Sequence, residues 1–155
     1  MPAKQILVVG ASGLAGFGAL KQFAAMADWD VVAVSRLRPR ACPDTVRHIP
    51  LDLLDPARCA AEFARMPAVT HIAYCAVNEK EGDLVGGWSD PAQAAKNMAM
   101  LRNVLDPVLD HASDFRHIGL VHGFKAYCSH MPDRMAPVPF KESMPRIAHE
   151  NLLSA

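Results

Sequence analysis

An apolar run followed by three evenly spaced glycines constrains this chain more than any other stretch. Residues 6–9 are a continuous aliphatic run, which predicts a strand buried on both faces. Gly10, Gly13 and Gly16 follow at intervals of three, and a helical spacing of apolar residues begins near Leu14. A strand, a tight glycine turn and a helix start, in this order, are typical of the phosphate-binding turn of a dinucleotide site.

Each glycine of this turn has its own predicted role. Gly10 permits the sharp turn, Gly13 lets the backbone approach a pyrophosphate, and Gly16 lets the helix pack close to the strand. The free N–H groups at the helix start would then bind the phosphate charge. We therefore predict that the cofactor contacts Gly10, Ser12, Gly13, Leu14 and Gly16. The alternative is a purely structural turn.

The second predicted strand, residues 29–34, ends at the place where dinucleotide-binding folds choose between NAD and NADP. An acidic residue there would bind the free 2′-hydroxyl of NAD, but Ser35 and Arg36 occupy the position. Arg36 is suited to hold the 2′-phosphate of NADP by charge-assisted hydrogen bonds. The alternative is a solvated basic loop, since Arg38 and Arg40 follow. The predicted cofactor is NADP (NADPH), with Ser35 and Arg36 at its phosphate.

The remaining segments alternate between strand and helix patterns. Strands are predicted over 46–50, 69–77 and 115–121, and helices from Leu14 to near Asp28, from Pro56 after an Asp55 cap, and over 91–111. Pro107 is expected to bend the last helix or end it early. One face of that helix is predicted to carry Ala95, Met98, Leu101, Leu105 and Leu109. The order predicts an α/β Rossmann fold, a doubly wound parallel sheet of strand order 3-2-1-4-5, truncated after the fifth strand.

Two further strand ends carry candidate cofactor contacts. Asp52 and Leu53 follow the third strand, where Asp52 is suited either to accept from an adenine amino group or to cap its own loop, two roles that the sequence leaves equal. Cys75 and Ala76 end the fourth strand, and their small side chains would let a cofactor lie close. His71, within that strand, is interpreted as a strand residue.

Composition excludes several classes of function. With 155 residues, half of them hydrophobic, the chain is long enough for one domain with a core. Its formal net charge of zero predicts no nucleic-acid or membrane partner. No apolar run is long enough to span a membrane, and no signal peptide precedes the first strand, so a cytoplasmic location is expected. The four cysteines form no CxxC pair, which predicts reduced thiols and no metal site.

The chain divides into a predicted NAD(P)-binding domain, 1–121, and an irregular, proline-containing tail, 122–155. This tail would lead into a substrate-binding half that is missing from the sequence. The fifth strand is then expected at a sheet edge, with part of its apolar face uncovered, which favours a homodimer or a partner chain.

Several segments together resemble a known family. Residues 10–16 resemble the extended short-chain dehydrogenase/reductases, and residues 97–106, 123–127 and 139–146 resemble the progesterone 5β-reductase/iridoid synthase-like (PRISE-like) reductases. The resemblance implies that the cofactor is NADPH. It also implies the family chemistry, in which hydride is added to the carbon–carbon double bond of a small-molecule enone.

The same resemblance implies roles for residues after the fifth strand. Lys125 matches the family lysine, which would hydrogen-bond the nicotinamide ribose and lower the pKa of a neighbouring phenol. Tyr127 is retained, whereas Ala126 replaces a histidine and Leu153 stands at the position of the catalytic tyrosine. A leucine cannot donate a proton, so the resemblance implies a fragment without full activity, which would act on an enone only if the missing half were supplied. Two other functions stay open: a non-catalytic NADP-binding sensor or regulatory module, and an NAD-dependent epimerase/dehydratase-like enzyme.

Overall fold

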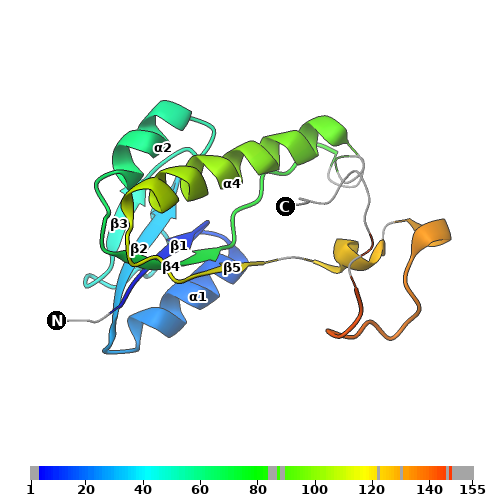
Figure 1. Cartoon of the computed structure of the whole chain (residues 1–155), viewed down its shortest axis with the longest axis horizontal. Helices are drawn as coiled ribbons and strands as arrows, with labels where there is room; N and C mark the ends of the chain where they lie inside the picture. Colours follow the sequence, from blue (N-terminus) through cyan, green and yellow to red (C-terminus); the bar gives the residue numbers. More distant parts are fainter. Residues whose placement is uncertain are drawn as a thin grey trace. The chain divides into compact units, whose positions relative to one another are not determined.

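The computed structural model describes residues 4–83, 87, 90–121, 123–129, 131–145 and 147 (Figure 1). The chain forms two compact units. The first consists of Met1–Val77 and Ala99–Val121, and the second of Asn78–Met98 and His122–Ala155. The predicted division into 1–121 and 122–155 remains a prediction. The two compact units are drawn differently from it, since residues 78–98 are grouped with the segment from 122 onward.

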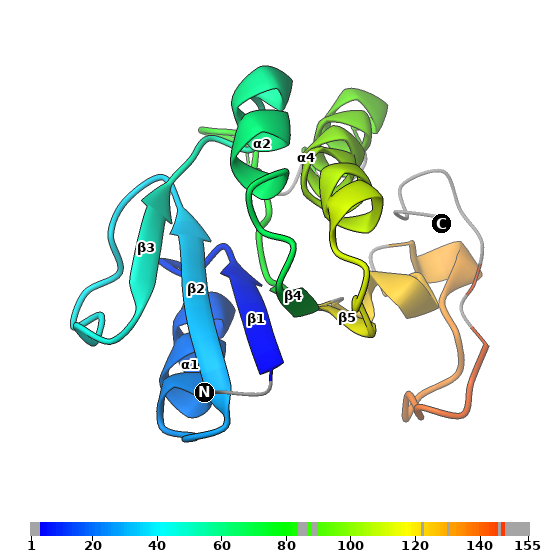
Figure 2. The same cartoon turned by 60° about the vertical axis from the view of Figure 1, so that its left-hand side comes forward.

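The first unit is built on a five-stranded parallel sheet. Its strands are β1 (Lys4–Val9), β2 (Trp29–Ser35), β3 (Arg47–Pro50), β4 (Val69–Tyr74) and β5 (His117–Leu120). They are ordered β3-β2-β1-β4-β5, and every neighbouring pair is parallel. The predicted fold class and strand order are therefore confirmed, as is the place of β5 at the edge of the sheet (Figure 2).

Helices cover both faces of this sheet. Helix α1 (Leu14–Ala24) lies on one face, and α2 (Pro56–Phe63) lies on the other, together with the part of α4 (Pro91–His111) that belongs to this unit (Figure 2). Alternate residues of β1 serve the two cores: Ile6 and Val8 pack toward α1, and Leu7 and Val9 pack toward α2 and α4. A strand buried on both faces needs such a continuous aliphatic run, as predicted for residues 6–9.

The start of α2 forms as the sequence predicts. Asp55 is its N-cap, and one carboxylate oxygen of Asp55 accepts a hydrogen bond from the Arg58 backbone N–H at 3.0 Å. Pro56 occupies the first helical position, where its missing N–H costs nothing. Cys59 and Phe63 are fully buried, and Met66 nearly so. One face of α2, continued by Met66 after the helix, therefore belongs to the core.

Several predicted boundaries differ from the structure, three elements by more than one or two residues. Helix α1 ends at Ala24 rather than near Asp28, because a turn in which Met26 N–H donates to the Phe23 carbonyl already leads into β2. Strand β4 ends at Tyr74 rather than at residue 77. Strand β5 covers His117–Leu120, less than the predicted 115–121. Backbone hydrogen bonds to the neighbouring strand continue for one residue past β4, at Cys75, and for one residue past β5, at Val121, and the regular ladder ends there.

The predicted span of α4 is confirmed, whereas part of its predicted buried face was wrong. The helix continues through Pro107 to His111, so the proline does not end it early. Val104 and Val108, on either side of the proline, are fully buried, and this packing offsets the hydrogen bond that a proline removes. The buried row is Met100, Val104 and Val108, continued by Ala112 just after the helix. Leu101 and Leu105 of the predicted row pack against this core and are partly buried, whereas Leu109 is 53% exposed and Ala95 is also exposed. Two neighbouring rows of α4 are apolar, and the sheet selects the row that the sequence pattern did not favour.

The described residues of the second unit include two short 3-10 helices, η1 (Phe124–Tyr127) and η2 (Pro132–Arg134). Backbone hydrogen bonds link η1 to the segments that follow it: Ala136 N–H donates to the Tyr127 carbonyl at 2.9 Å, and Ile147 N–H donates to the Ala126 carbonyl at 3.0 Å. The Tyr127 ring stacks on Phe140, with ring centroids 5.0 Å apart. The proline-containing segment therefore has local order of its own.

Candidate functional site

The glycine turn between β1 and α1 has a distinct steric requirement at each glycine. Gly10 has a φ of +81°, and a Cβ added there would lie 2.7 Å from the Ala76 backbone. A Cβ on Gly16 would lie 2.1 Å from the Gly10 carbonyl oxygen. A Cβ on Gly13 would meet only that oxygen, at 3.4 Å. The fold therefore requires glycine at positions 10 and 16, whereas Gly13 is needed neither for its φ nor for close packing.

The amide groups of this turn are only partly used by the protein. The Val34 carbonyl of β2 accepts from Gly10 N–H at 2.8 Å and from Ala11 N–H at 3.2 Å, which ties the turn to the end of β2. Gly13 is the N-cap of α1 and offers no side-chain cap, and the first helical turn carries no acidic residue. The N–H groups at the start of α1 therefore lack the side-chain partner that Asp55 gives to α2. Such a helix start favours an anion.

The residues around this helix start are open to solvent. Ser12, Gly13 and Ala15 are exposed, and Leu14 is 96% exposed. The Leu14 side chain therefore lies exposed beside backbone N–H groups, and a ligand with both a charged and an apolar part can contact both.

The end of β2 carries the predicted specificity residues. Ser35 is buried, and its hydroxyl donates to the Leu37 carbonyl at 2.7 Å. Arg36 is exposed, and no carboxylate of the described residues forms an ion pair with it. The Ser35 hydroxyl therefore serves the loop, while the Arg36 guanidinium has no ionic partner in the described part of the chain.

The ends of β3 and β4 place the other predicted contacts. One carboxylate oxygen of Asp52 accepts from Leu54 N–H at 3.0 Å, so Asp52 caps its own loop; a contact with adenine stays a prediction. Leu53 is buried. Cys75 N–H donates to the Val9 carbonyl at 2.8 Å, and Ala76 is the backbone that Gly10 approaches.

Parallel pairing brings these strand ends to one edge of the sheet. Gly10 is bonded to β2 through Val34 and lies against Ala76 after β4, and Leu51 N–H after β3 donates to the Ser35 carbonyl at 3.3 Å. The carboxyl edge of a doubly wound sheet, where the strand order reverses, is the usual place for a ligand. In this chain that reversal lies between β1 and β4.

The residues with implied catalytic roles belong to the second unit. Lys125 lies in η1, and its side chain is outside the described part of the structure. The Tyr127 hydroxyl donates to the Lys141 carbonyl at 3.2 Å. Leu153 lies outside the described residues. The catalytic assignments therefore remain predictions.

Amide side chains that shape two loops were missed in the sequence. Asn97 accepts from Asn78 N–H at 2.7 Å and donates to the Asn78 carbonyl at 2.9 Å, while Gln93 donates to the Asn78 side-chain oxygen at 2.9 Å. In the first unit, Asn103 donates to the Leu53 carbonyl at 2.8 Å. Two asparagines inside a helix were the available signal, because Asn seldom favours a helix interior without a partner.

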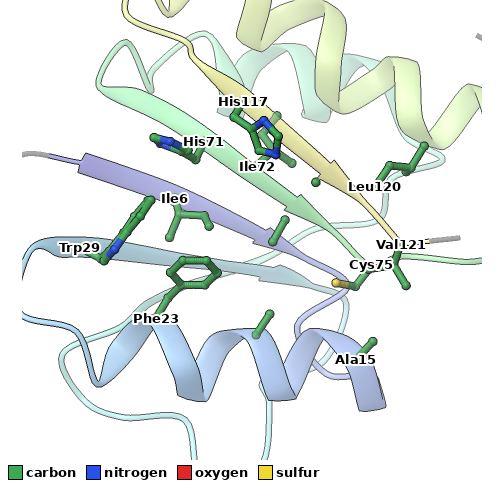
Figure 3. Close-up of a pocket in the computed structure, with 13 residues that line it drawn as sticks. Ile6, Ala15, Phe23, Trp29, His71, Ile72, Cys75, His117, Leu120 and Val121 are labelled. Atoms are coloured by element: carbon green, nitrogen blue, oxygen red, sulfur yellow. The ribbon is translucent and has the colours of Figure 1, made fainter. Parts of the chain in front are cut away.

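A groove of about 540 Å³ lies on the α1 side of the sheet, over β4 and β5 (Figure 3). His71 and His117, which are register partners, lie side by side at one end, and Cys75 lies at the other (Figure 3). The walls are mostly apolar: Ile6, Ala15, Ala19, Phe23, Trp29, Ile72, Ala73, Gly119, Leu120 and Val121. Among the described residues predicted to contact the cofactor, only Cys75 lines this groove, but Ala15 at the start of α1 also lines it, so one end of the groove reaches the neighbourhood of the glycine turn.

Neither metal ligands nor reactive thiols stand out in the described structure. Within the described ranges, no group of three or more His, Cys, Asp or Glu side chains is arranged to hold a metal ion. All four cysteines are free. Burial raises the pKa of the Cys59 thiol to about 11 and also raises the pKa of Cys75, so both are protonated at neutral pH and poor nucleophiles. No helix in the described part of the chain is long and apolar enough to cross a membrane.

The sequence matches a family profile over most of its length. Residues 6–134 match the profile described as "NAD dependent epimerase/dehydratase family". Two curated relatives are "(S)-8-oxocitronellyl enol synthase" from Antirrhinum majus and "3-oxo-Delta(4,5)-steroid 5-beta-reductase" from Arabidopsis thaliana. Each is 28% identical over 94% of this chain, and each match covers 38% of the relative. The chain therefore spans well under half the length of these relatives.

Solved structures show the same fold. The Bordetella bronchiseptica enzyme WbmG, solved with NAD and UDP, superposes with a TM-score of 0.67 and 16% identity, over 93% of this chain and 44% of that one. A short-chain dehydrogenase from Burkholderia cenocepacia J2315, solved with NADP, gives a TM-score of 0.63 and 19% identity, over 81% of this chain and 56% of that one. At these identities the likeness concerns the fold alone.

Proposed function

Because the chain belongs to the NAD dependent epimerase/dehydratase family, we propose that its first unit binds a nicotinamide adenine dinucleotide at the carboxyl edge of the sheet, and NADP(H) in preference to NAD(H). The pyrophosphate lies at the start of α1 against Gly13. The adenosine 2′-phosphate lies at Arg36, and the adenine lies toward Asp52 and Leu53.

One observation carries this proposal: two features that attract anions lie at neighbouring strand ends and are joined through one carbonyl. The start of α1 has no side-chain cap, and the Arg36 guanidinium has no ion-pair partner among the described residues. The Val34 carbonyl, two residues before Arg36, accepts hydrogen bonds from the first two amides of the glycine turn, Gly10 N–H and Ala11 N–H. A dinucleotide carries two phosphate groups for the helix start and, in NADP, a third for the arginine.

The reaction proposed for the lineage is hydride transfer from NADPH to an enone carbon–carbon double bond. The sequence similarity to an enol synthase and a steroid 5-beta-reductase supports this class, with Lys125 as the residue that holds the nicotinamide ribose. Catalysis in the whole protein also needs a donor for the developing enolate oxygen. Leu153 cannot supply it, and the Tyr127 hydroxyl is bonded to the Lys141 carbonyl.

The hydrogen bond of the Tyr127 hydroxyl to the Lys141 carbonyl favours a second candidate function, a non-catalytic module that binds NADP(H) and reports its presence to a partner. In that case the chain would show no turnover with enones, and Lys125→Ala would change only the affinity for the cofactor. An epimerase-like reaction has no such specific support from the described residues.

The test is a fluorescence titration of the purified chain with NADPH and NADH. Hydrogen bonds from Arg36 to a phosphate contribute about 1.5–3 kcal/mol, so NADPH is expected to bind at least about tenfold more tightly than NADH. Arg36→Ala should bring the NADPH affinity down to that of NADH. Arg40→Ala, in the same exposed basic loop, is the matched control and should leave the ratio unchanged. Equal affinities in the wild type, or an unchanged ratio in Arg36→Ala, would contradict the proposal.

A further inference from the structure

We propose that His48 is a positioning residue for NADP(H) selectivity, acting through Ser35 on the loop that carries Arg36. This inference rests on the proposed binding of NADP(H) and adds a residue of β3 that contributes no direct contact to the phosphate. It is carried by three hydrogen bonds that join His48, Ser35 and Leu37, which we call the His48–Ser35–Leu37 relay.

The acceptors of this relay fix where its hydrogens are. Carbonyl oxygens only accept, so the 2.7 Å contact between Ser35 Oγ and the Leu37 carbonyl takes the hydroxyl hydrogen. The 3.2 Å contact between His48 Nε2 and the Ser35 carbonyl likewise requires hydrogen on Nε2. At 3.1 Å, the same N–H is then shared with Ser35 Oγ, which has only its lone pairs left to offer. His48 therefore donates to both oxygens of Ser35.

The relay lies at the last rung of the β2–β3 pairing. Ser35 is the last residue of β2, and its register partner on β3 is Pro50, so in this parallel ladder the Ser35 carbonyl pairs with the next residue, Leu51. The Ser35 carbonyl receives one backbone hydrogen bond from Leu51 at 3.3 Å and a second from His48. His48 thus strengthens the β2–β3 pairing at the rung from which the loop departs.

The consequence concerns Arg36, which lies between the two residues that the relay holds. On its N-terminal side, Val34 and Ser35 are bonded to the glycine turn and to β3. On its C-terminal side, the Leu37 carbonyl is bonded to Ser35 Oγ. The backbone of Arg36 is therefore placed before any ligand arrives, which lowers the conformational entropy lost when its side chain binds a phosphate. Only a cofactor with a 2′-phosphate gains from this placement.

The experiment compares NADPH and NADH affinities, and the melting temperature, for wild type, His48→Ala, His48→Gln, Arg36→Ala and the double variant His48→Ala/Arg36→Ala. His48→Ala should weaken NADPH binding about three- to tenfold, the range of one neutral hydrogen bond, and change NADH binding less than about twofold. His48→Gln, whose amide N–H can reach the same oxygens, should retain most of the selectivity. In the Arg36→Ala background, His48→Ala should have no further effect on NADPH.

These outcomes separate the inference from the proposed function. If Arg36→Ala lowers the affinity for NADPH, but His48→Ala lowers the affinities for NADPH and NADH equally or changes neither, the positioning role is wrong and the NADP(H) site stands. If Arg36→Ala binds NADPH as the wild type does, both are wrong. Should His48→Ala not fold, nitrogen-15 NMR of the wild-type histidine ring and the selectivity of His48→Gln decide: a ring without hydrogen on Nε2, or selectivity lost in His48→Gln, would overturn the relay. His111→Ala, on the exposed end of α4, is the control and should change neither affinity.

Discussion

Replacing Gly13 with valine should abolish cofactor binding and leave the fold largely intact. The backbone at Gly13 has φ −80° and ψ 169°, a region open to every residue, and the new Cβ would meet only the Gly10 carbonyl oxygen at 3.4 Å. A β-branched residue is a poorer N-cap than glycine, which costs about 1 kcal/mol. The folded state should tolerate a loss of this size.

The loss of binding should be much larger than the loss of stability. The valine side chain would occupy the space in front of the α1 N–H groups, where the pyrophosphate is proposed to lie. Two hydrogen bonds to a charged phosphate, at about 1.5 kcal/mol or more each, amount to about 3 kcal/mol, or a weakening of at least about 100-fold. Gly13→Ala, with a smaller side chain, should fall between valine and wild type.

The assay pairs NADPH fluorescence titration with circular dichroism. Gly18→Ala is the control, because a Cβ at that exposed position of α1 has no atom within 4 Å and alanine favours a helix. Gly16→Ala should behave in the opposite way to Gly13→Val: its Cβ would lie 2.1 Å from the Gly10 oxygen, so the fold itself should be destabilised. Retained NADPH binding in a folded Gly13→Val protein would refute the reasoning and make the turn purely structural.

Three more predictions follow from other parts of the molecule. Burial lowers the pKa of His71, so the unfolded chain takes up a proton more readily and the free energy of unfolding should fall as the pH drops below about 6.5. Denaturant titrations at several pH values should show a weaker pH dependence of this free energy in His71→Gln, and an unchanged dependence would contradict the prediction. Because β5 is an edge strand beside an apolar groove, the chain should self-associate at high concentration, and Val121→Lys, at a 60% exposed position, should reduce this; monomeric light scattering throughout would count against it. Enone-dependent oxidation of NADPH should be at least about 100-fold slower than in a reductase that keeps the tyrosine which Leu153 replaces; robust turnover in the wild type, abolished by Tyr127→Phe, would instead identify Tyr127 as the proton donor.

Local signals and the alternation of elements were sufficient to predict the fold. The aliphatic run at 6–9, the glycine turn and the Asp55–Pro56 cap each act within a few residues, and the structure has them where the sequence places them. Their order limits the sheet to very few topologies, because parallel crossovers have one hand. Strand order 3-2-1-4-5 could therefore be predicted without any knowledge of contacts.

What could not be predicted depends on partners that are distant in the sequence. The buried row of α4 is selected by the sheet beneath it: the spacing of apolar residues favoured the row of Leu109, whereas the structure buries Val108. The Asn103 bond to the Leu53 carbonyl joins residues 50 positions apart. The His48–Ser35 contact exists only in the register that pairs Ala33 with His48. Side-chain roles of this kind require the assembled structure.

The central claim is that a dinucleotide binds at the carboxyl edge of the sheet, and NMR of the nitrogen-15-labelled chain titrated with NADPH tests it most directly. The account predicts the largest amide shifts at Gly10–Gly16 and around Arg36, with NADH producing smaller changes at Arg36. Shifts confined to the end of the groove near Trp29, His71 and His117, away from the carboxyl edge, or no shifts at millimolar NADPH in a folded protein, would contradict it.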